Sequence, residues 1–187
     1  MSNSIKEQSK FGRFNVLTLT KDQASSQYLS DDTSYICLMP FEKTLAGGIK
    51  SVYLLQFPNH SLGKVDCSLI IDPVNEDLDR TQYDSVCRSL IEEAGINIDD
   101  YGLSEDHIFY LGDITLSTPV SAKMHCFGID LTGPKSQPEF TRTLSKDSFT
   151  KDDSTIIKAG FHEIVNGNYS DATVLAGSFL LISYFNS

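Results

Sequence analysis

Apolar and polar residues alternate in several short stretches on both sides of one helical segment. Alternation predicts β-strands, because successive side chains of a strand point to opposite faces. We expect strands at residues 14–19, 34–39, 51–57, 65–71, 108–116, 123–131 and 155–162. The strand at 34–39 should end before Pro40, since proline lacks the N–H that a neighbouring strand accepts. Residues 22–32 are polar and predict a loop, and the glycines at 47–48 predict a turn.

The clearest helix lies between Thr81 and Gly95. Apolar side chains recur in it at steps of three and four residues, which predicts one buried face. These residues are Tyr83, Val86, Cys87, Leu90, Ile91 and Ala94. Thr81 and Asp84 can form a capping box at the start of the helix. Gly95 suits the left-handed backbone that follows the last turn.

The order of the elements predicts an α+β fold. We expect an α/β/α sandwich, in which a mixed β-sheet is flanked by the helix at 81–95 and by a C-terminal helix. The C-terminal helix should begin after a cap at Ser170 or Asp171 and reach Tyr184. Residues 1–32 are expected to form an N-terminal extension with a first strand, and residues 33–187 one domain.

Composition narrows the class of protein. The chain has 187 residues and a net charge of -10, which disfavours broad non-specific binding to nucleic acid. Its four cysteines lack CxxC spacing, so we expect free thiols in a reducing, cytoplasmic compartment. Residues 1–10 are polar, unlike a secretory signal, and the apolar run at 172–185 is too short and too interrupted for a membrane span.

Residues 88–96 carry the candidate chemistry. They read Arg-Ser-Leu-Ile-Glu-Glu-Ala-Gly-Ile, with two adjacent carboxylates near the end of the helix. This segment resembles the core of the Nudix box, the motif of hydrolases that cleave a nucleoside diphosphate linked to another group. The pattern runs Gly, five residues, Glu, seven residues, then Arg-Glu-apolar-x-Glu-Glu-x-Gly-apolar. The matching residues are Arg88, Leu90, Glu92, Glu93, Gly95 and Ile96. Ser89 and Arg80 replace two glutamates of the pattern, and Val74 replaces its first glycine.

The resemblance implies a Nudix fold over residues 33–185, nearest to the ADP-ribose pyrophosphatase branch. The ligand would be a nucleoside diphosphate derivative such as ADP-ribose, and the resemblance makes a homodimer or a larger assembly plausible. In an active protein Glu92 and Glu93 would hold Mg²⁺ or Mn²⁺, and Arg88 would orient them. These three residues are the candidate catalytic residues. We expect Ser89, Glu92 and Glu93 on one side of the helix, away from the apolar stripe.

The substitutions leave two functions open. The first is a metal-dependent pyrophosphohydrolase. The second is a catalytically silent Nudix-fold module that serves as a ligand sensor or as a structural component of a larger assembly. A solvated helix face would also explain a Glu-Glu pair. Glu76, Asp77 or Asp79 could replace the missing upstream glutamate by a register shift, or could act only as favourable charges near the helix N-terminus.

Overall fold

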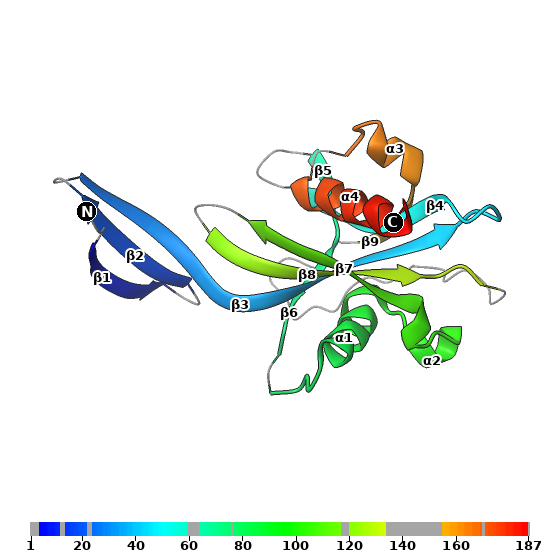
Figure 1. Ribbon diagram of the computed structural model, residues 1–187, viewed down its shortest axis with the longest axis horizontal. Coiled ribbons are helices and arrows are strands. Elements are labelled where there is room, and N and C mark those ends of the chain that lie inside the picture. Colours follow the sequence, from blue (N-terminus) through cyan, green and yellow to red (C-terminus); the bar gives the residue numbers. More distant parts are fainter. Residues whose placement is uncertain are drawn as a thin grey trace.

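The computed structural model describes residues 4–11, 14–21, 24–59, 64–75, 77–116, 120–133, 155–169 and 171–186. The described strands form one mixed sheet of nine. Helix α1 (Gln82–Ala94) lies on one face of this sheet and helix α4 (Ala172–Asn186) on the other (Figure 1). The prediction of an α+β fold, with a mixed sheet between the motif helix and a C-terminal helix, is confirmed.

Strand β3 is the centre of the sheet, since it pairs with β2, β4, β6 and β8. The β3–β8 pair is parallel, and the antiparallel pairs around it make the sheet mixed. The strands are β1 Ser4–Phe11, β2 Phe14–Lys21, β3 Ala24–Lys43, β4 Ile49–Asn59, β5 Lys64–Ser68, β6 Ile70–Pro73, β7 Ile108–Leu116, β8 Val120–Asp130 and β9 Thr155–Gly160. The short helices are α2 Ile98–Tyr101, η1 Glu105–His107 and α3 Phe161–Val165.

Strand β3 is longer than its sequence pattern predicts. It begins at Ala24, inside the segment for which we expected a loop, and it continues through Pro40 to Lys43. Both expectations were wrong. The polar segment is a strand because its backbone pairs with β2. Pro40 is tolerated because the antiparallel partner changes there: residues 35–38 pair with β6 and residues 41–43 with β4.

Two further boundaries differ from the prediction. The strand expected at 65–71 is divided into β5 and β6 at Leu69, which is 1% exposed. The strand expected at 155–162 ends at Gly160, and His162 lies in α3. The hairpin of residues 34–57 is confirmed, with a turn at Gly47 whose φ is 86°.

Helix α1 begins and ends as its sequence predicts. The backbone N–H of Asp84 donates to Thr81 Oγ1, and the N–H of Thr81 donates to the Asp84 carboxylate, which completes the capping box. Gly95 has left-handed backbone with a φ of 68°. The core between α1 and the sheet includes Ile36, Leu38, Ile70, Val86, Leu90, Ile96 and Ile129. This packing fixes the side of α1 that faces the sheet.

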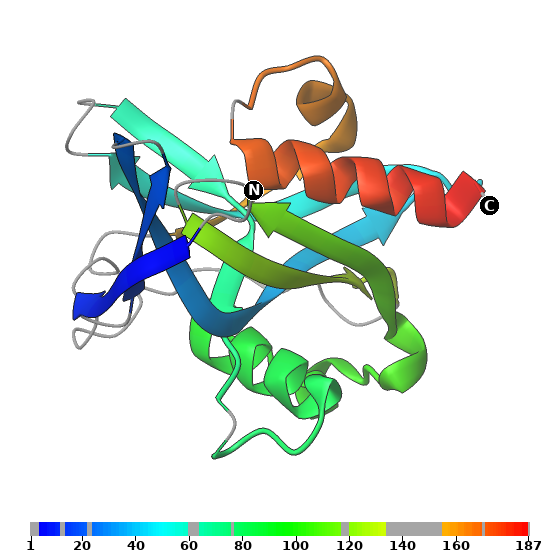
Figure 2. The same ribbon diagram turned by 60° about the vertical axis from the view of Figure 1, so that its left-hand side comes forward.

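Helix α4 covers the opposite face of the sheet (Figure 2). Asp171 caps it, because its Oδ1 accepts from the N–H groups of Thr173 and Val174. The helix approaches the sheet closely at Gly177, where a Cβ would lie 2.6 Å from Leu69 Cδ1. No helix in the described part of the chain has both the length and the apolar character needed to cross a membrane.

We predict that Gly177→Val lowers the free energy of unfolding by about 1–3 kcal/mol, the usual cost of overpacking a core. The added side chain would clash with Leu69 and Met39, both of which are fully buried. Urea denaturation measures the effect. Ser183→Val adds the same side chain to an exposed position of α4 and is the matched control. Equal losses in both variants would contradict the close approach at Gly177.

Candidate functional site

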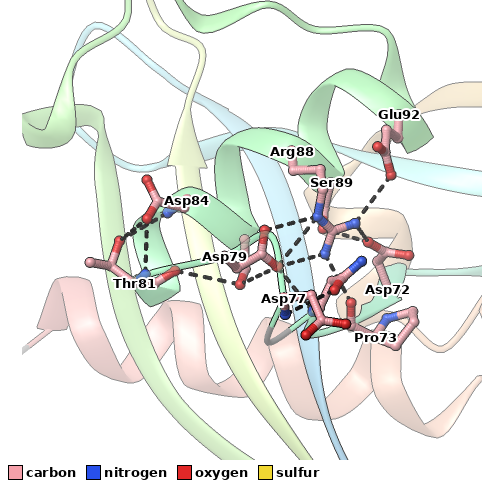
Figure 3. A network of polar contacts seen from close by, with 11 residues as sticks. Asp72, Pro73, Asp77, Asp79, Thr81, Asp84, Arg88, Ser89 and Glu92 are labelled. Carbon is pink, nitrogen blue, oxygen red and sulfur yellow. Dashed lines mark hydrogen bonds and ion pairs between the residues drawn. The ribbon is translucent and has the colours of Figure 1, made fainter.

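The guanidinium of Arg88 is the centre of a polar network at α1 (Figure 3). Its Nε lies 3.0 Å from Asp79 Oδ1, and its Nη2 lies 2.8 Å from Asp79 Oδ2. Its Nη1 lies 2.5 Å from Asp72 Oδ2 and 3.1 Å from Glu92 Oε2. Nη2 also donates to the carbonyl oxygen of Pro73 at 2.9 Å. One cation therefore contacts three carboxylates, which come from β6, from the loop before α1 and from α1 itself.

Asp79 is fixed by the loop as well as by Arg88. Its Oδ2 accepts from the N–H of Asn75 at 3.0 Å and from the hydroxyl of Ser85 at 2.8 Å. The side chain of Asp79 is only 3% exposed. Hydrogen bonds from Arg88 are the main cause that lowers the pKa of Asp79 to about 2. Asp79, one residue before Arg80, thus supplies a carboxylate to Arg88, as a shift of the Nudix pattern by one residue would allow. Asp77 is exposed and does not pair with Arg88.

Ser89 stands where the Nudix pattern has a glutamate, and it is completely buried. Its hydroxyl donates to Asp72 Oδ2 at 2.9 Å. Asp72 is 8% exposed and lies on β6, so a carboxylate reaches this place from the sheet rather than from the helix. The sequence interpretation missed Asp72, because only the position of the Asp-Pro pair at the end of a predicted strand could have pointed to it.

The two candidate metal ligands on α1 differ in exposure. Glu92 has a side chain that is 55% exposed and pairs with Arg88. Glu93 is 5% exposed and shares the buried side with Ser85 and Ser89, at four-residue spacing along the helix. The expectation that Ser89, Glu92 and Glu93 lie away from the packed face was therefore wrong for Ser89 and Glu93, which are buried, and only Glu92 is exposed. Ser89 and Glu93 are buried because their side of α1 packs against the rest of the protein.

The described residues do not form a preorganised binding site for Mg²⁺ or Mn²⁺. In the part of the chain that the structure describes, no three carboxylate, imidazole or thiol groups converge on a point where a cation could bind. Asp72, Asp79 and Glu92 instead surround the guanidinium of Arg88. A divalent cation would compete with Arg88 for the same oxygen atoms. These three carboxylates are thus arranged around a cation that belongs to the protein.

A second polar cluster is built on the buried carboxylate of Glu42, which joins three strands. Both of its oxygens lie 2.7 Å from Lys158 Nζ on β9, and it accepts a hydrogen bond from the Tyr53 hydroxyl on β4. Burial alone would raise the pKa of Glu42, but the bonds from Lys158 and Tyr53 lower it below its usual value. Tyr53 belongs to the core beneath α1. The cluster was missed in the sequence because Glu42 and Lys158 are 116 residues apart.

A third polar cluster lies on β7 and β8. Asp113 Oδ1 contacts His125 Nδ1 at 2.7 Å and accepts from the Tyr110 hydroxyl at 2.6 Å. Asp113 Oδ2 pairs with Lys123 at 2.8 Å. Bonds from Lys123 and Tyr110 are the leading causes that lower the pKa of Asp113 to about 2. The cluster fixes the orientation of the His125 ring.

We predict that Asp79→Asn lowers the free energy of unfolding at pH 7 by about 1.5–3 kcal/mol, the range for hydrogen bonds to a charged group. The pKa of Asp79 is about 2 in the folded chain and about 3.9 in an unfolded one. Its contribution is therefore complete above about pH 4 and is lost as the pH falls toward 2. Urea denaturation across this range should show the difference between the two proteins shrinking.

Asp77→Asn is the matched control, because Asp77 is an exposed aspartate in the same loop. It should change the free energy of unfolding by less than about 0.5 kcal/mol. A loss in Asp79→Asn that stayed constant from pH 7 to pH 2 would show that the Arg88–Asp79 pair does not supply the stability.

We predict that Ser89→Glu lowers the free energy of unfolding by about 3–5 kcal/mol, because it buries a second carboxylate beside Asp72. Adding Asp72→Ser should recover part of this loss, since the new glutamate could then take the place of Asp72 next to Arg88. Ser89→Ala, the control, removes one hydrogen bond and should cost about 1 kcal/mol. No recovery in the double variant would mean that the two positions are not interchangeable.

Comparison with known proteins rests on structure alone, since no family model and no curated protein matches the sequence. The crystal structure of an ADP compounds hydrolase superposes with a TM-score of 0.62 at 13% identity and covers 100% of this chain and 95% of that chain. The NUDIX domain of Shewanella oneidensis NrtR, crystallised with ADP ribose, gives a TM-score of 0.50 at 13% identity over 84% of this chain and 89% of that chain.

A chain in the complex of the C-terminal domain of mouse MUTYH with human PCNA gives a TM-score of 0.52 at 10% identity, over 83% of this chain and 91% of that chain. At identities this low, the superpositions show a common fold. This common fold agrees with the motif residues on α1 and with the position of that helix against the mixed sheet. The chain has the Nudix fold.

Proposed function

We propose that this chain is a Nudix-fold module that binds a nucleoside diphosphate derivative such as ADP-ribose and does not turn it over efficiently. The observation that carries the proposal is the network of Arg88, which engages the carboxylates of Asp72, Asp79 and Glu92. The ligand class is supported by the similar folds of an ADP compounds hydrolase and of the NrtR domain crystallised with ADP ribose.

The energetics of Arg88 favour a silent module. Breaking one partner from a buried ion pair costs about 3–5 kcal/mol. A divalent cation that bound with a dissociation constant of about 1 mM would contribute only about 4 kcal/mol. A metal that took Asp72 away from Arg88 would therefore gain little. Substrate binding that relied on such a metal would be weak for the same reason.

Metal-dependent hydrolysis is the second candidate. It is favoured by the Glu92-Glu93 pair, since both acids stand at the positions that the Nudix pattern requires. In that case the ion pair between Arg88 and Glu92 would orient the carboxylate of Glu92. The two candidates differ in whether the ligand is cleaved and in whether Glu93 is needed for cleavage.

We predict that ADP-ribose binds with similar affinity in EDTA and in Mg²⁺ or Mn²⁺, as measured by titration calorimetry. Phosphorus NMR of the same samples should show no AMP or ribose 5-phosphate beyond the rate of a protein-free control. Cleavage that Glu93→Gln abolishes, and that Glu105→Gln leaves intact, would instead establish the enzyme. Glu105 is a suitable control because it is an exposed glutamate outside α1. If ADP-ribose neither binds nor is cleaved, both candidates fail for this ligand.

A further inference from the structure

The buried carboxylate of Glu42 has two lysines beside it, Lys158 and Lys50. Lys158 Nζ lies 2.7 Å from each carboxylate oxygen, and Lys50 Nζ lies 3.9 Å from Oε2. The hydroxyls of Tyr53 and Ser51 donate to the same carboxylate. These five residues are here called the Glu42 cluster. In this cluster two positive charges share one negative charge.

The charge balance of the Glu42 cluster differs from that of the other ion pairs. Arg88 has three carboxylate partners, while Lys43 and Lys123 each pair with one aspartate. Counting Lys and Arg against Asp and Glu, the Glu42 cluster is the one ion-paired group in the described part of the chain with an excess of positive charge. The whole chain has a net charge of -10. A local excess of positive charge in an acidic protein favours the binding of an anion at that place.

The two lysines keep hydrogen-bond donors for such an anion. An ionised carboxylate accepts about four hydrogen bonds, and Glu42 receives that number from Lys158 and the two hydroxyls. Lys50 lies beyond hydrogen-bonding distance of Glu42, and its side chain is 58% exposed. Lys158 has three N–H groups, of which Glu42 takes two, and its side chain is 32% exposed. Both ammonium groups can therefore bind a ligand from solvent.

The Glu42 cluster lies on the face of the sheet that α1 covers. Tyr53 belongs to the core beneath α1, and so does Ile156 on β9. Lys158 is two residues farther along β9 than Ile156, so the two side chains leave the strand on the same face. The lysines are thus on the same face of the sheet as the motif helix, at the strands β4 and β9.

We propose that Lys50 and Lys158 bind the diphosphate group of the nucleoside diphosphate derivative, without a metal ion. The inference rests on the proposed function, in which the protein itself must offset the charge of the diphosphate. Arg88 is already surrounded by three carboxylates, so it has no charge to spare. Lys158 and Lys50 lie 2.7 and 3.9 Å from the same oxygen of Glu42, so one diphosphate group can contact both ammonium groups.

Titration calorimetry with ADP-ribose in EDTA tests the proposal. Lys50→Gln should weaken binding at least about fivefold, because a charge-assisted hydrogen bond to the phosphate is lost. Lys43→Gln is the matched control and should bind within about twofold of the wild type. Lys43 is a partly exposed lysine that pairs with Asp130, and it packs on Phe185 of α4, on the opposite face of the sheet. Binding that Lys50→Gln leaves unchanged would overturn the proposal.

Two further variants separate charge from folding. Lys50→Arg keeps the positive charge and should bind within about twofold of the wild type, and Lys158→Gln should weaken binding at least about tenfold. Because Lys158→Gln removes the main partner of a buried carboxylate, circular dichroism should check its fold. Lys50→Gln changes an exposed side chain and decides the test by itself. A loss of affinity in Lys158→Gln alone would give Lys158 a structural role and refute the diphosphate contact.

Inorganic pyrophosphate, titrated in EDTA, distinguishes this inference from the proposed function. Pyrophosphate that binds the wild type and loses affinity in Lys50→Gln, while ADP-ribose does not bind, would keep the lysine site and refute the ligand proposed above. ADP-ribose whose affinity neither lysine variant changes would keep the proposed function and refute the lysine site. No binding of either compound up to about 10 mM would overturn both.

Discussion

Arg88 joins parts of the chain that would repel one another in its absence. Its guanidinium contacts Asp72 on β6, Asp79 in the following loop and Glu92 on α1. Three carboxylates at this spacing disfavour the folded state unless a cation lies among them. Because β6 pairs with β3 at the centre of the sheet, the same contacts also fasten α1 to the core. The position of the motif helix therefore depends on this side chain as well as on the apolar core beneath α1.

The same network determines what chemistry the site can support. Ser89 is buried against Asp72, so the space in which a helix glutamate would lie is filled by a carboxylate from the neighbouring strand. That carboxylate is held by Arg88 rather than directed toward solvent. The carboxylate beside Ser89 comes from the sheet, and its partner is an arginine. This arrangement stabilises the fold through an ion pair between Arg88 and Asp72.

Local signals in the sequence predicted the helices and strands. Long-range contacts determined the strand partners and the polar contacts of the candidate site. The capping box of Thr81 and the left-handed Gly95 act within a few residues, so the limits of α1 could be predicted. Pro40 was misjudged because its tolerance depends on a change of partner strand. The contact of Ser89 with Asp72, and that of Glu42 with Lys158, join residues on different elements. No periodicity or spacing in the sequence encodes such pairs.

Five of the six motif residues that this chain keeps have a structural task, the exception being Glu93. Leu90 and Ile96 are completely buried in the core beneath α1, and Gly95 ends the helix. Arg88 holds the ion-pair network, in which Glu92 takes part. At Ser89 and Arg80 the pattern has changed without loss of the fold, because Asp72 and Asp79 provide the carboxylates that Arg88 requires. Contacts that stabilise the fold therefore account for Arg88, Leu90, Glu92, Gly95 and Ile96, and Glu93 is the motif residue on which the two proposed functions differ.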